Sequence, residues 1–90
     1  MPHESSVSDT LGWIHVLKGN TKLGAEFIKE AIAQDKENKK NINPEMLYHL
    51  AKANLALDDK ASALENINTA LEGKNHPKYD KFLELKNSIK

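Results

Sequence analysis

The four histidines are the residues of this chain best suited to bind a metal ion or to move a proton near neutral pH. They are His3, His15, His49 and His76. None belongs to an H-E-x-x-H pattern, in which two histidines on one helical face share a zinc ion. The chain also has no cysteine, which excludes thiolate ligands, disulfides and thiol nucleophiles. We therefore expect no metal site and no cofactor, and we expect His15 to be a partly buried structural residue.

Two further patterns resemble catalytic sites only superficially. Glu26 and Glu30 lie on one helical face, but Lys22 and Lys29 are close to them, which is typical of a solvated surface. The segment 19–24, "GNTKLG", has glycines and a lysine but lacks the G-x-x-x-x-G-K-[ST] order of a phosphate-binding loop. We therefore predict that the protein is not an enzyme.

The composition predicts the size and the partner class. A chain of 90 residues, 39% of them hydrophobic, forms one small domain with a thin core. The 13 basic residues balance the 13 acidic ones, so net charge favours neither nucleic acid nor an anionic membrane surface. No apolar run approaches the roughly 20 residues that span a bilayer. We expect no nucleic-acid partner and no direct membrane insertion, and the localisation stays open.

The apolar residues recur at intervals of three and four, which predicts an all-α domain. Gly19 is suited to end a helix in a left-handed conformation, and Asn43 followed by Pro44 is a typical helix start. The first helix carries its apolar residues at Val7, Leu11, Ile14, Val16 and Leu17. The expected helices cover about 5–18, 22–35, 44–57, 60–72 and 77–90.

The two halves of the chain align with each other when residues 39 positions apart are compared. Both halves keep intervals of twelve and seven residues between small side chains. Small side chains at such intervals let two antiparallel helices approach closely. The sequence therefore predicts two copies of one helix hairpin, in which the aligned pairs are Leu11 with Leu50, Gly12 with Ala51, Gly24 with Ala63, Ile28 with Ile67 and Ala31 with Ala70.

This pattern resembles the tetratricopeptide repeat (TPR) family, whose signature W-x2-L-G-x2-Y, A-x3-F and a closing proline spans about 34 residues. The matching residues are Ser8, Leu11, Gly12, His15, Gly24, Ile28 and Ala31 in the first copy, and Leu47, Leu50, Ala51, Asn54, Ala63, Ile67 and Ala70 in the second. Most aromatic positions are replaced, Lys36 stands in place of the proline, and the extra residues of the spacing fall in the loop "KENKKNI".

The resemblance implies a fold and a function. The fold is a right-handed α-α superhelix of two TPR helix hairpins plus a C-terminal capping helix, in one domain over 1–90, with repeats at 5–38 and 44–76 and the cap at 77–90. In this family the first helix of each hairpin lines a concave groove that receives a segment of a protein or peptide partner. The resemblance places Asp9, Trp13, Val16, Tyr48, His49, Lys52 and Leu55 in that groove.

Trp13 and Tyr48 are of the residue types that anchor interfaces, because their side chains are large, rigid and amphipathic. Some TPR proteins grip a C-terminal carboxylate with a lysine and an asparagine, which Asp9 and Trp13 replace here, so that activity is not favoured. We expect a protein-protein interaction module. The alternative is a structural C-terminal cap or homodimerisation unit without a separate ligand. Trp13 either lines the groove or packs between the hairpins.

The start of the chain adds one expectation. Pro2 lies where the closing proline of a preceding repeat would fall, so we expect the chain to begin at a repeat boundary. The segments "LGW" and "YHLA" resemble the C-terminal part of larger bacterial repeat proteins. Two repeats and a cap are fewer than the three or so that such proteins need for stability. We therefore expect the outer surface of the first hairpin to be covered by upstream repeats or by a second copy of the chain.

Overall fold

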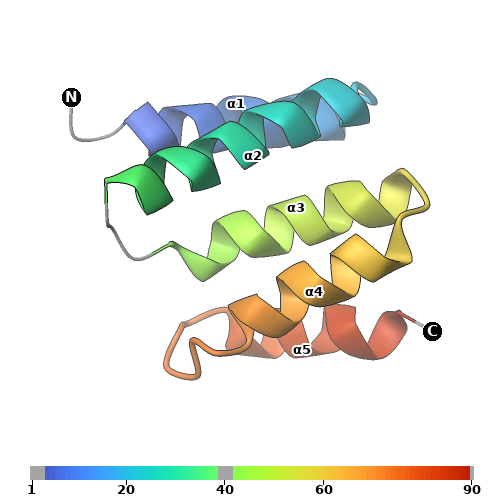
Figure 1. Cartoon of the computed structure of the whole chain (residues 1–90). Helices are drawn as coiled ribbons and strands as arrows, with labels where there is room; N and C mark the ends of the chain where they lie inside the picture. Colours follow the sequence, from blue (N-terminus) through green and yellow to red (C-terminus); the bar gives the residue numbers. More distant parts are fainter. Residues whose placement is uncertain (1–3, 39–41, 90) are drawn as a thin grey trace.

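The structure is a computed structural model that describes residues 4–38 and 42–89, and this part of the chain contains five α-helices and no strand (Figure 1). The all-α class predicted from the apolar spacing is confirmed. Pro2 and residues 39–41 of the loop "KENKKNI" lie outside the described residues. The helices are α1 (Glu4–Leu17), α2 (Thr21–Glu37), α3 (Pro44–Ala56), α4 (Lys60–Ala70) and α5 (Tyr79–Ser88).

The helix ends follow local chemistry. Gly19, after α1, has a φ of +91°, the left-handed conformation that glycine adopts without steric cost. Asn43 begins α3, and its Oδ1 accepts a hydrogen bond from the backbone N–H of Glu45 at 3.0 Å. Asp59 caps α4 in the same way, by accepting from the N–H of Ser62. Such caps stabilise a helix by about 1 kcal/mol each.

Four of the expected helix ends were wrong by two residues. Helix α2 ends at Glu37 rather than at residue 35, and α5 ends at Ser88 rather than at residue 90. The other two ends lie on either side of the turns between α4 and α5. Helix α4 ends at Ala70 rather than at residue 72, and the next residues form turns. Helix α5 begins at Tyr79 rather than at Pro77, because the segment before it is also a turn. Helix termini often differ by this amount between pattern and structure, since the last turn is held by few bonds.

The helices pack in order along the chain. Helices α1 and α2 form one antiparallel pair, α3 and α4 form a second, and α2 packs on α3 between them. Helix α5 lies against the second pair at the far end from α1 (Figure 1). The largest fully buried side chains are Ile28 in the first pair, Ile67 in the second, and Phe82 of α5.

The predicted close approach within each helix pair is present. An ideal Cβ on Gly12 would lie 2.6 Å from the carbonyl oxygen of Gly24, so α1 and α2 touch backbone to backbone. The equivalent residues of the second pair, Ala51 and Ala63, are fully buried. The aligned residues further along are also fully buried in both copies, namely Ile28 with Ile67 and Ala31 with Ala70.

Candidate functional site

Trp13 of α1 and His49 of α3 join the two helix pairs on the face that α1 and α3 share. Their rings are stacked, with centroids 4.3 Å apart and 12° between the planes. One turn before Trp13, the Oδ1 of Asp9 lies 3.2 Å from the Nδ1 of His49, a distance that fits a hydrogen bond from the ring to the carboxylate. Trp13 is half-buried. It therefore both packs between the pairs and lines this face.

Lys52 and Tyr48 of α3 continue the cluster. The Nζ of Lys52 lies 5.8 Å from the centroid of the Trp13 ring and 5.3 Å from that of Tyr48, within cation-π range of both. Tyr48 in turn contacts Phe82 of α5, with ring centroids 5.2 Å apart. Aromatic contacts thus run from α1 through α3 to α5. We call the surface formed by Asp9, Trp13, Tyr48, His49 and Lys52 the aromatic face.

An open depression of about 330 Å³ lies at the α5 end of the aromatic face. Its lining residues are Tyr48, Lys52, Lys81, Glu84 and Leu85. The last three are absent from the groove predicted from the sequence, because a capping helix is not expected to line it. The spacing of Phe82 and Leu85 predicts that α5 has an apolar side that packs against the rest of the domain. The spacing does not identify the helix against which that side packs.

Two of the residues assigned to the groove do not join the aromatic face. Val16 and Leu55 are partly buried and pack against the hydrophobic core. Val16 lies at the crossing of α1 and α2, where its Cγ2 would be 2.6 Å from a Cβ on Gly24. Val16 lies three residues after Trp13, and Leu55 lies three residues after Lys52. Three residues fall about 60° short of a full helical turn, so both side chains are rotated away from the aromatic face, toward the paired helix.

The carboxylate of Glu45 connects the aromatic face to α5. Its Oε2 accepts a hydrogen bond from the Nζ of Lys78 at 2.5 Å and lies 3.8 Å from the Nε2 of His49. The hydrogen bond from Lys78 lowers the pKa of Glu45 below its ordinary value of 4.5. Partial burial opposes this lowering, while the charges of Lys78, His49 and His76 add to it.

Acid should weaken the protein in part through Glu45. A carboxyl whose pKa is lower in the folded state stabilises the fold above its unfolded pKa, and this stabilisation is lost as the pH falls through the folded value. We expect the free energy of unfolding to fall further between pH 5 and pH 3 in the wild type than in Glu45→Gln. The difference should stay below about 1 kcal/mol, because the pair is partly exposed and screened by solvent.

Urea unfolding at several pH values measures this effect. Glu26→Gln is the matched control, because Glu26 is an exposed glutamate on α2, which packs on α1 and α3 rather than on α5, and it should keep the wild-type pH dependence. Equal pH dependence in Glu45→Gln and the wild type would contradict the assignment.

Within residues 4–38 and 42–89, no three acidic or histidine side chains are grouped so that they could hold a metal ion. None of the described helices is both long enough and apolar enough to cross a membrane. No family model, curated protein or solved structure matches the chain. The described part of the chain is an all-helical domain, and its candidate functional site is the aromatic face.

Proposed function

We propose that this protein is a TPR-like interaction module that binds a segment of a partner protein across the aromatic face. One observation carries the proposal: Trp13, His49, Lys52 and Tyr48, from helices far apart in the sequence, form one continuous cluster. Clustered aromatic side chains flanked by a cation are typical of the residues that dominate binding energy at protein interfaces. The proposal concerns binding alone and includes no active site, which would need enclosed polar groups that converge on one point.

The repeat of 39 residues supports the TPR-like part of the proposal. Asp9 and Trp13 of α1 are 39 residues before Tyr48 and Lys52 of α3, so the aromatic face uses equivalent positions of the two pairs. Repeat proteins build extended binding surfaces in this way, since each repeat presents the same helix face to the partner. The proposed arrangement is a right-handed superhelix in which α1, α3 and α5 line the binding side.

The side chains of the depression indicate the chemistry of the segment. Leu85 and the ring of Tyr48 offer apolar surface, while Lys52 and Lys81 offer two cations close together. A segment with an aliphatic or aromatic side chain next to an acidic one would match both. Glu84 in the depression and Asp9 elsewhere on the aromatic face add negative charge, which disfavours a polyanionic partner such as nucleic acid.

Selection from a phage-displayed library of random peptides tests the proposal. Peptides selected on the wild type alone are then titrated against the wild type and against each variant by isothermal titration calorimetry, which does not depend on the single tryptophan, Trp13. We expect Lys52→Ala to weaken the selected peptides by roughly tenfold, and Trp13→Ala by a hundredfold, as for central interface residues.

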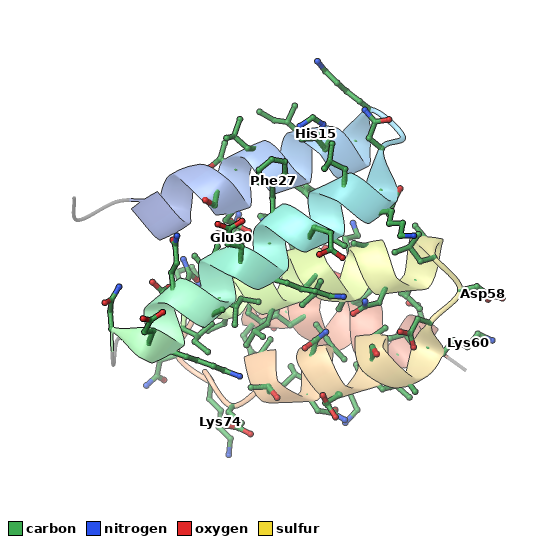
Figure 2. All side chains as sticks on the ribbon, turned by 45° about the horizontal axis from the view of Figure 1, so that its top comes forward. His15, Phe27, Glu30, Asp58, Lys60 and Lys74 are labelled. Carbon is green, nitrogen blue, oxygen red and sulfur yellow. The ribbon has the colours of Figure 1, made fainter. Side chains whose placement is uncertain are left out.

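Lys74→Ala is the matched control, because Lys74 is an exposed lysine on the turn after α4 (Figure 2) and is not one of the residues of the aromatic face. It should bind the same peptides as the wild type. Circular dichroism of Trp13→Ala reports whether the helices remain. If every selected peptide binds Lys52→Ala and the wild type equally, the aromatic face is not the binding surface.

A further inference from the structure

The first helix pair has an apolar outer face, on the side away from α3. This face is formed by Leu11, Ile14 and His15 of α1, by Lys18 in the turn after α1, and by Leu23, Phe27 and Glu30 of α2. The rings of His15 and Phe27 stack across the two helices, with centroids 5.5 Å apart and 7° between planes. Figure 2 shows this pair between α1 and α2, with Glu30 further along α2. We call these seven residues the outer face.

The outer face exposes large apolar side chains. Leu11 is 44% exposed, Ile14 41% and Leu23 49%. Beside them, the Nδ1 of His15 is buried and has no hydrogen-bond partner in the described part of the chain. Exposed leucines scattered singly are ordinary, but a contiguous group on two helices marks an interaction surface.

The second helix pair shows what the equivalent face looks like when it is covered. Leu50, Ala53 and Asn54 stand 39 residues after Leu11, Ile14 and His15, and they are only 5%, 0% and 4% exposed because α2 packs on α3. The equivalent of the His15–Phe27 pair is Asn54 hydrogen-bonded to Asn66 at 2.8 Å. The uncovered copy is the more apolar of the two, with isoleucine for alanine and phenylalanine for asparagine.

We infer that the outer face is the dimer interface of this protein, occupied by the outer face of a second copy. Its charges can pair across a two-fold axis: Lys18 lies in the α1–α2 turn, and Glu30 lies just past the middle of α2, beyond Leu23 and Phe27. A two-fold related, antiparallel copy brings Lys18 of each chain to Glu30 of the other, with the leucines and isoleucines between them. A two-fold contact of this kind closes at two chains.

Stacking of copies head to tail is less suited to this chain. The other end of the helix stack is occupied by α5, whose Phe82 is fully buried against the second pair. The inference does not depend on the proposed peptide binding, because Asp9 and Trp13 point toward α3 rather than to the outer face. A dimer would carry two aromatic faces and bind two partner segments.

Sedimentation equilibrium from about 10 µM to about 1 mM tests the inference. The wild type should approach twice the chain mass of 10.1 kDa as concentration rises. Ile14→Glu should raise the dimer dissociation constant at least a hundredfold, because a charge would be buried in an apolar contact. Leu57→Glu is the matched control: Leu57 is 44% exposed at the end of α3, outside the outer face, and should leave the mass unchanged.

Charge exchange separates a specific dimer from a change in folding. Lys18→Glu and Glu30→Lys alter exposed residues, and each alone should raise the dissociation constant roughly tenfold, since each symmetric dimer contains two such pairs. The double variant should return to within about threefold of the wild type, because the opposite charges meet again. A wild type that stays at 10.1 kDa at about 1 mM, or a double variant as weak as the single ones, would overturn the inference.

Discussion

Replacement of Gly24 by alanine is expected to lower the free energy of unfolding by about 3 kcal/mol and the melting temperature by roughly 15 °C. A Cβ at this position would lie 2.6 Å from Val16 Cγ2, 2.9 Å from the Val16 nitrogen, and closer still to the carbonyl oxygen of Gly12. The obstacle is largely the backbone of α1, which cannot move aside as a side chain can. Alanine favours a helix by about 1 kcal/mol over glycine, and this gain is too small to offset the clash.

The second helix pair supplies the control for this experiment. Ala63 is the equivalent of Gly24, and there the methyl group is already buried without such a clash. Ala63→Gly should therefore cost only about 1 kcal/mol, through lower helix propensity and a small cavity. Thermal and urea unfolding followed by circular dichroism measure both variants. A Gly24→Ala protein as stable as the wild type would show that α1 and α2 do not cross as closely as described.

Replacement of Phe82 by alanine is expected to release α5 from the second helix pair. Phe82 is the fully buried residue of α5, and its ring lies 5.2 Å from those of Tyr48 and His76. Loss of a buried phenylalanine typically costs about 3–5 kcal/mol. Because α5 has little else buried, we expect the loss to appear as local opening of this helix while the first four helices stay folded.

Hydrogen exchange followed by mass spectrometry tests this prediction peptide by peptide. The amides of α5 should exchange much faster in Phe82→Ala, and those of α2 and α3 should be nearly unchanged. Leu83→Ala is the control, since Leu83 is the next residue and is 39% exposed. Uniformly faster exchange across all helices would mean that α5 is an integral part of the core rather than a docked element.

The same variant examines the contribution of α5 to binding. Lys81, Glu84 and Leu85 form one side of the depression next to Tyr48 and Lys52. If α5 opens, peptides that contact both sides should bind more weakly, although Trp13 and His49 remain in place. Unchanged peptide affinity in Phe82→Ala would restrict the proposed site to α1 and α3.

The sequence by itself determined the helices and their close pairing. The three-and-four spacing of apolar residues predicted an all-helical chain, and Gly19 and Asn43 marked two helix boundaries that the structure confirms. The repeated small residues identified the crossings of α1 with α2 and of α3 with α4. The helices and their ends depend on residues a few positions apart, and the close pairing follows from one pattern that is repeated along the chain. Both can therefore be recognised in the sequence alone.

Only the tertiary structure decided which side chains meet. It placed His49 between Asp9 and Trp13, and it joined Glu45 to Lys78 across 33 residues. It turned Val16 and Leu55 to the core, brought Leu85 of α5 next to Tyr48 and Lys52, and left Leu11 and Ile14 uncovered. The helical period sets the direction of a side chain around its own axis, but the position and tilt of the neighbouring helix depend on packing along the whole contact.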